Sequence, residues 1–183
     1  GIGAVYRLDE RWTLLAGVHK GFNSPAPGSD AGAEESTNYE AGVRFNAGSA
    51  NLELVAFYND YSNLVGTCTA STGAGCDIGD QFSGGEVDMH GLELNGGYAF
   101  ELSSGLGVPV QLSYTYTSAE FATSFASGFD EWGDVQRGDA LPYLPEHQAQ
   151  LMTGLVAERW KLNLSAAYIG EMRVAAGQGP TGP

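Results

Sequence analysis

Residues 89–100 read Met-His-Gly-Leu-Glu-Leu-Asn-Gly-Gly-Tyr-Ala-Phe, and their two-residue rhythm points to the fold class. Leu92 and Leu94 fall on one side, whereas Glu93 and Asn95 fall on the other. Successive side chains of a β-strand point to opposite faces of the sheet. The stretch therefore predicts a strand with one apolar face and one polar, glycine-containing face.

The same alternation recurs along the chain, and a helical period is absent almost everywhere. It predicts an all-β, antiparallel fold of about eight strands. The expected strands run roughly over residues 1–8, 12–22, 38–47, 51–61, 89–100, 110–117, 146–157 and 162–168. In the strand at 51–61, Val55 and Phe57 interrupt the polar face, so the pattern fixes its orientation less firmly.

The connections between these strands alternate between short and long. The long ones cover residues 23–37, 62–88 and 121–145, and all of them fall at one end of the predicted sheet. A soluble sandwich can show this arrangement by chance. Outer-membrane barrels show it systematically, with short periplasmic turns and long extracellular loops. The pattern thus favours a segment of an antiparallel transmembrane β-barrel.

Three further features favour a lipid-facing apolar side over a packed core. The predicted strands are mostly about ten residues long, near the ~9–11 that a tilted membrane strand needs, whereas soluble strands more often have about five or six. The apolar face also mixes Leu and Val with Ala and Gly, which lipid tolerates better than a packed core does. Aromatic residues gather near strand ends on that face, as in an interfacial girdle: Trp12, Tyr39, Phe45, Tyr58, Tyr98, Phe100, Tyr116, Trp160 and Tyr168.

This orientation gives testable side-chain assignments. We expect Leu92, Leu112 and Leu164 to face lipid. Their polar neighbours should face the lumen: Glu93, Gln111 and Asn163.

The composition narrows the function classes. The formal net charge is -14 with 8 Lys and Arg residues, so a basic footprint for nucleic acid is absent. Aromatic residues make up 11% of the chain, which argues against overall disorder. Both ends of the sequence interrupt a pattern, so we expect a segment of a longer protein.

Both cysteines, Cys68 and Cys76, lie in one predicted loop. A metal site would need more ligands, and the three histidines are scattered along the chain. A disulfide fits the pair better than free thiols or a metal site, and it implies an oxidising compartment.

Enzyme chemistry finds little support. His19, Ser24 and Asp30 could be imagined as a nucleophilic set, but no spacing enforces it. We therefore expect no catalytic residue, no resident metal and no cofactor. Four loop acids could offer oxygens to Ca²⁺ but lack a regular ligand spacing: Asp77, Asp80, Glu86 and Asp88.

A series of short motifs extends over nearly the whole chain: GVHKGFNSP at 17–25, ESTNYEAGVR at 35–44, AFYNDY at 56–61, the loop and return strand at 68–93, and LPEH at 144–147. In this order they resemble the TonB-dependent outer-membrane receptors, and especially their ferric-citrate-receptor-like branch. The resemblance implies a barrel of roughly 22 strands closed by an N-terminal plug. It also implies nutrient import driven by the inner-membrane TonB complex.

Residues 1–183 would then be a late-middle part of the barrel domain, without the plug, the TonB-contact segment or the final strand. The implied location is the outer membrane of a Gram-negative bacterium. The implied partners are a ferric chelate such as a siderophore or citrate complex, outer-membrane lipid, and the TonB complex through the missing N-terminal part. Two alternatives stay open: a passive porin-type barrel, and a soluble β-rich surface binding module.

The long loops are expected to form part of the outer mouth that captures the ligand. Residues with groups able to make oriented contacts are the candidate ligand-binding set: Asn23, Gln81, Phe82, Trp132, Arg137 and Tyr143. These loops are acidic, and Arg137 is the one basic residue between Ala122 and Pro145. For an anionic chelate, other loops would have to supply positive groups, or the ligand is of a different kind.

Overall fold

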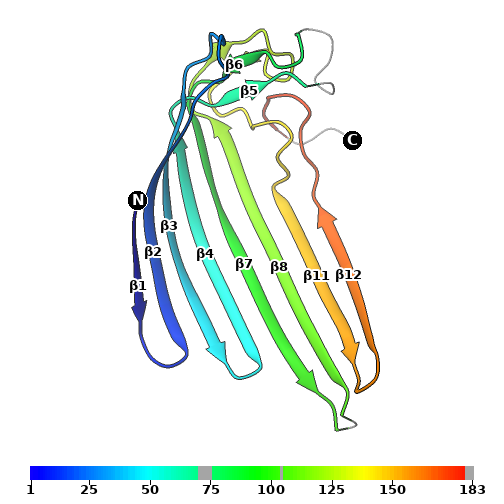
Figure 1. Ribbon diagram of the computed structural model, residues 1–183. Helices are drawn as coiled ribbons and strands as arrows, with labels where there is room; N and C mark the ends of the chain where they lie inside the picture. Colours follow the sequence, from blue (N-terminus) through cyan, green and yellow to red (C-terminus); the bar gives the residue numbers. More distant parts are fainter. Residues whose placement is uncertain (70–75, 104, 180–183) are drawn as a thin grey trace.

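The computed structural model describes residues 1–69, 76–103 and 105–179. Its main element is one curved antiparallel sheet of eight strands, in the order β1-β2-β3-β4-β7-β8-β11-β12 (Figure 1). The strands of this sheet are β1 (Ile2–Arg7), β2 (Trp12–Asn23), β3 (Glu34–Ala47), β4 (Ala50–Tyr61), β7 (Val87–Glu101), β8 (Gly107–Phe121), β11 (His147–Val156) and β12 (Lys161–Ile169). The predicted all-β class and the eight main strands are confirmed.

Two small hairpins, which the sequence pattern did not predict, lie in the long loops. One pairs β5 (Val65–Thr67) with β6 (Gln81–Ser83), and the other pairs β9 (Phe125–Ala126) with β10 (Asp134–Val135). Strand β3 begins at Glu34, so the first long loop is shorter than expected and covers 24–33. Residues 34–37, which were expected to lie in this loop, belong to β3 and pair with β2, with Glu34 opposite Asn23.

Short turns occupy one end of the sheet and long loops the other (Figure 1). At the β1–β2 turn, the Asp9 carboxylate accepts hydrogen bonds from the backbone N–H groups of Arg11 and Trp12, at 2.7 and 2.8 Å. These two bonds hold the pKa of Asp9 below its usual range. At the β3–β4 turn, Gly48 has a φ of 56°, a conformation that favours glycine.

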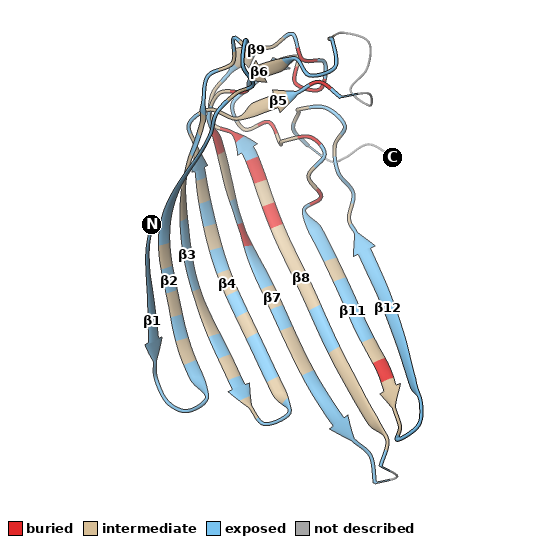
Figure 2. Ribbon diagram, in the orientation of Figure 1, coloured by how far each residue is buried: buried red, intermediate tan, exposed pale blue. Residues whose placement is uncertain are grey.

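The two faces of the sheet differ as the alternation predicts, and Figure 2 shows the resulting bands of exposure along the strands. On β4, Leu52 and Leu54 are exposed, whereas Glu53, Val55 and Phe57 are half-buried on the opposite face. The half-buried residues line a hollow that reaches from β1 to β8, which identifies their face as the concave one. Val55 and Phe57 therefore belong to the concave face, which settles the orientation of this strand.

The predicted outward residues are exposed: Leu92 by 44%, Leu112 by 41% and Leu164 by 60%. Glu93, Gln111 and Asn163 are exposed as well, so it is the alternation along the strands that places the leucines on the convex face. Aromatic rings of this face pair between neighbouring residues near both ends of the strands. The ring centroids of Trp12 and Phe45 lie 4.7 Å apart near the short turns, and those of Tyr39 and Tyr58 lie 6.2 Å apart nearer the loops. The convex face thus presents an apolar surface with aromatic borders.

A buried core forms only at the loop end in the part of the chain that the structure describes. Its members come from the ends of β7 and β8 and from the loop at 122–146: Val87, Ala119, Phe121, Phe129, Trp132 and Val135. Among the described residues, no helix is long and apolar enough to cross a membrane.

Candidate functional site

The loop end of the sheet carries the candidate site. Loops 24–33, 62–86 and 122–146 gather there, and the segment 170–179 reaches the same end after β12 (Figure 1).

The β5–β6 hairpin orders the loop at 62–86. Backbone hydrogen bonds extend it in both directions, with Leu64 N donating to Gly85 O at 2.9 Å and Cys68 N donating to Asp80 O at 2.8 Å. Cys68 and Cys76 form the predicted disulfide, with their Cα atoms 6.2 Å apart. The predicted covalent closure of this loop is therefore confirmed.

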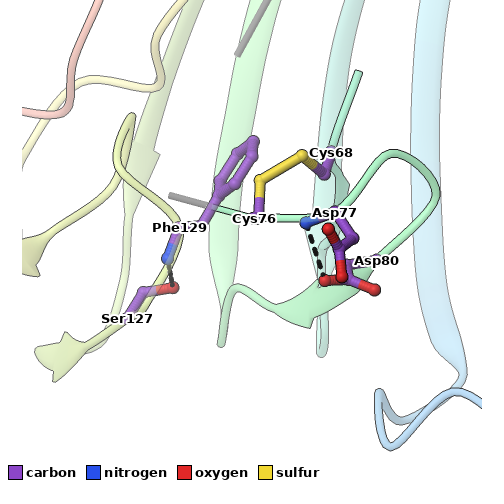
Figure 3. The surroundings of a disulfide bond; sticks show 6 residues. All are labelled: Cys68, Cys76, Asp77, Asp80, Ser127 and Phe129. Atoms are coloured by element: carbon purple, nitrogen blue, oxygen red, sulfur yellow. Dashed lines mark hydrogen bonds between the residues drawn. A yellow bond between two sulfur atoms is a disulfide. The ribbon is translucent and has the colours of Figure 1, made fainter. Parts of the chain in front are cut away.

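The disulfide lies against the aromatic part of the neighbouring loop. Cys76 packs on the buried core, and Figure 3 shows Phe129 beside the two sulfur atoms. On the other side of the bond, Asp77 N donates to Asp80 Oδ2 at 3.0 Å. The bond thus joins a polar turn to an apolar contact surface.

Loop 122–146 folds back on itself around the β9–β10 hairpin. The backbone N–H of Phe129 donates to Ser127 Oγ at 3.1 Å, and Trp132 N donates to Phe129 O at 2.9 Å. Farther along, the buried Asp139 accepts from Gln136 N at 2.8 Å. These local bonds direct the aromatic side chains of the loop inward.

Trp132 is the centre of the aromatic packing and is only 6% exposed. Its ring centroid lies 5.8 Å from that of Phe121, 6.0 Å from that of Phe125 and 5.1 Å from that of Phe129, all in edge-on arrangements. Such arrangements are favourable for aromatic pairs beyond the area they bury. The loop is therefore packed onto the end of β8 rather than extended into solvent.

The segment 170–179 covers part of this loop through backbone hydrogen bonds. Ala140 N donates to Gly177 O at 2.8 Å, and Ala176 N donates to Glu131 O at 2.8 Å. Beneath the segment lies a polar hollow of about 680 Å³. Charged and aromatic residues line it, among them Glu120, Glu146, His147, Tyr168 and Arg173.

The six predicted ligand-contact residues fall into two groups. Three of them take part in packing or hydrogen bonding within the loops. Gln81 Oε1 accepts from Ala26 N at 2.6 Å, the Phe82 ring stacks on Phe129 at 5.4 Å, and Trp132 is buried. The structure thus brings Phe82 and Trp132 together in one cluster.

The other three are exposed and lie outside that cluster: Asn23, Arg137 and Tyr143. Asn23 ends β2, and Arg137 N donates to Ser124 Oγ at 2.9 Å. Tyr143 is 51% exposed and has a φ of 59°, the left-handed region that a non-glycine residue rarely adopts. A ligand-contact role for the six residues stays a prediction.

The concave face carries a second group of polar residues. Arg44 pairs with Glu53 between neighbouring strands, in a charge-assisted contact. Glu40 and Glu93 line the same hollow of about 640 Å³. These residues give the concave face a polar wall, and within the described residues its one ion pair is that of Arg44 and Glu53.

Sequence reasoning missed the packing of the loops on one another. One signal was available: Phe121, Phe125, Phe129 and Trp132 recur at intervals of three or four within a stretch assigned to a polar loop. An aromatic-rich loop indicates buried packing rather than free solvent contact. In the described part of the chain, no three His, Cys, Asp or Glu side chains come together to hold a metal ion.

Comparison with known sequences agrees with this architecture. The profile described as "TonB dependent receptor-like, beta-barrel" matches residues 1–182. The chain belongs to the TonB-dependent receptor β-barrel family. No curated protein matches the chain.

Two solved structures share the fold of this TonB-dependent receptor segment. The FrpB iron transporter from Neisseria meningitidis (F3-3 variant) superposes with a TM-score of 0.59 at 13% identity, covering 91% of this chain and 26% of that one. The ferric enterobactin receptor PfeA, solved in complex with BCV-L6, superposes with a TM-score of 0.60 at 18% identity, covering 97% of this chain and 29% of that one. The segment therefore spans between a quarter and a third of either structure.

Proposed function

We propose that this chain is part of the barrel wall and outer mouth of an outer-membrane receptor that imports a ferric chelate with energy from the TonB complex. The observation that carries the proposal is the family match over residues 1–182. Receptors of this family are outer-membrane proteins of Gram-negative bacteria. The similar solved structures are described as an iron transporter and a ferric enterobactin receptor, which supports iron as the transported metal.

The exposed convex face fits a wall in contact with lipid. It presents Leu92, Leu112 and Leu164 at the surface, and aromatic rings border it toward both ends. An outward apolar band flanked by aromatic girdles is the surface that a membrane barrel needs. A soluble binding module would have to leave this whole face uncovered in water, which makes that alternative the weaker one.

The concave face would meet the plug domain of the intact receptor. Glu40 and Glu93 line its hollow, while Glu53 is already paired with Arg44. Within the described residues, Glu40 and Glu93 form no ion pair, so both can accept a cationic group that a partner brings. In a passive porin this face would be in contact with water. The presence of a plug domain in the full-length protein would therefore distinguish a TonB-dependent receptor from a porin.

Ligand capture would occur at the loop end through the exposed residues Asn23, Arg137 and Tyr143. More specifically, we propose a chelate of the ferric-citrate class. Because such a chelate is anionic and the loops of this segment are acidic, other loops of the receptor would have to supply positive groups. Arg137 is the one basic side chain of loop 122–146 and would contact an anionic chelate directly.

The test uses the full-length receptor at constant surface expression, with uptake of radiolabelled ferric citrate and ferric enterobactin as the readout. We expect uptake of one chelate that a protonophore abolishes, because TonB coupling depends on the energised inner membrane. Deletion of residues 125–140 or of 70–84 should lower affinity for that chelate. If both deletions leave affinity and uptake unchanged, these loops do not capture the ligand, and the segment contributes only to the barrel wall. Uptake that persists without energy would favour the porin.

A further inference from the structure

Strand β6 lies between two loops and presents a different surface to each. Side chains alternate along a strand, so Gln81 and Ser83 point to one side while Phe82 and the position of Gly84 belong to the other. The two sets have opposite chemistry, one polar and one apolar. The β5–β6 hairpin, here called the central hairpin, can therefore hold two different neighbours at once.

The polar side holds loop 24–33. Ala26 N donates to Gln81 Oε1 at 2.6 Å, and Gly32 N donates to Ser83 Oγ at 3.1 Å. Close to the hairpin, Asn63 Nδ2 also donates to Gly32 O at 3.1 Å. Three side chains of loop 62–86 thus bind the backbone of loop 24–33 near both of its ends.

The apolar side holds loop 122–146. Phe82 stacks on Phe129, and the Trp132 indole lies against the hairpin backbone at two glycines. A Cβ atom on Gly66 would lie 2.8 Å from Trp132 Cη2, and one on Gly84 would lie 2.8 Å from Trp132 Cζ3 and closer still to Cη2. Real side chains essentially never approach so closely, so the ring occupies the space that only glycine leaves open.

Further bonds close the same joint. Glu86 N donates to Thr123 Oγ1 at 3.2 Å, and Ala122 N donates to Glu86 O at 2.8 Å. The disulfide fixes the far end of the hairpin beside Phe129. Loop 122–146 is consequently joined to the central hairpin at its start, at its aromatic centre and beside the disulfide.

From these contacts we infer that the central hairpin couples loop 24–33 to loop 122–146, so that the three loops of this segment move as one body. Gln81, Phe82 and Trp132 then serve as positioning residues that hold the exposed capture residues in a fixed arrangement. The functional part of this inference rests on the proposed function, whereas the coupling itself is independent of any ligand. Contact of a ligand with one loop would be transmitted to the other through the hairpin.

Hydrogen exchange of the purified full-length receptor tests the coupling without ligand. Trp132→Ala should accelerate amide exchange by about tenfold or more in loop 122–146, in the central hairpin and in loop 24–33. The hydrogen bonds described above join loop 24–33 to Gln81, Ser83 and Asn63, so an effect there would have passed through the hairpin. The matched control is Trp160→Ala, because Trp160 is 52% exposed at the short-turn end. It should leave all three loops unchanged. Acceleration confined to 122–146 would overturn the inference.

A second pair of variants keeps the test decisive if Trp132→Ala does not assemble. Gln81→Ala combined with Ser83→Ala should accelerate exchange in loop 24–33 and leave loop 122–146 protected. Gly66→Ala should reproduce the Trp132→Ala effect, because its Cβ atom would lie 2.8 Å from Trp132 Cη2 and its other near neighbours are side-chain atoms of the same aromatic cluster. In the double variant with Trp132→Ala it should add little, because the ring it displaces is already absent. Additive effects, or full protection of loop 24–33 in every variant, would contradict the coupling.

Binding then separates this inference from the proposed function. If both hold, Trp132→Ala weakens the binding of labelled ferric citrate or ferric enterobactin at least several-fold, although the buried ring is not exposed to a ligand. If exchange accelerates in all three loops but neither ferric citrate nor ferric enterobactin binds, the coupling of the loops stands and the proposed class of ligand is rejected. If Trp132→Ala uncouples the loops but leaves the affinity for the chelate unchanged, the positioning role of Trp132 is rejected.

Discussion

Phe57 lies with its ring over Gly91 of the neighbouring strand, on the concave face of the sheet. A Cβ atom on Gly91 would lie 2.6 Å from Phe57 Cζ and would also collide with the backbone oxygen of Tyr116. The two residues are direct register partners of β4 and β7. The absence of a side chain at Gly91 leaves the space that the Phe57 ring occupies on the wall.

This contact predicts that Gly91→Ala impairs barrel assembly. Neither the ring nor the β8 backbone can give way freely, and overpacking of this kind typically costs about 1–3 kcal/mol. The control is Gly96→Ala on the same strand, where the nearest atom is Leu52 Cδ1 at 3.3 Å, the end of a flexible side chain. Heat-modifiable migration of the full-length receptor on a gel reports the folded fraction. Equal folded fractions for the two variants would contradict the steric argument.

Leu112→Arg should impair assembly much more than Gln111→Arg. The two residues are neighbours on β8, and Leu112 lies on the convex face while Gln111 lies on the concave one. An arginine facing lipid at mid-membrane costs about 2–4 kcal/mol, whereas one facing a polar lumen does not. The measurement is the amount of folded receptor in isolated outer membranes. Equal tolerance of both substitutions would reverse the assignment of the faces.

Replacement of Cys68 and Cys76 by serine should loosen loop 62–86 while the barrel wall stays folded. Closing a loop of this length constrains the unfolded segment by about 2–3 kcal/mol on the entropy model. We expect faster proteolysis within the loop and unchanged heat-modifiable migration. The wild-type receptor treated with a reductant provides the matched comparison and should behave in the same way. Two free thiols in the mass spectrum of the unreduced wild-type protein would contradict the bond itself.

Tyr143→Asn should stabilise the receptor and weaken its ligand binding. The left-handed conformation at this position costs an ordinary residue about 1–2 kcal/mol, and asparagine tolerates it better. The same change removes the exposed ring that is proposed to contact the ligand. Thermal unfolding of the full-length receptor and titration with labelled ferric citrate measure the two effects. Tyr168→Asn, at an exposed strand residue without this backbone strain, should give no gain in stability.

The sequence alone determined the wall. Eight main strands, their exposed apolar faces and the segregation of turns from loops all follow from alternation with a period of two. That property is local, because each residue's face depends only on its position along its own strand. The disulfide could also be predicted, since the chain offers Cys68 no other cysteine than Cys76.

The tertiary structure decided where the interrupting residues of the wall point and how the loops pack. Phe57 faces inward because Gly91 on another strand leaves room for its ring. Trp132 is buried because Gly66 and Gly84, distant in the chain, flank one surface of the central hairpin. A loop read by itself shows which side chains can form contacts, but its partners are set by the register of other strands. The spacing of its aromatic residues can indicate that loop 122–146 is packed, but a local pattern cannot show that Trp132 packs on the central hairpin or that Arg137 is left exposed.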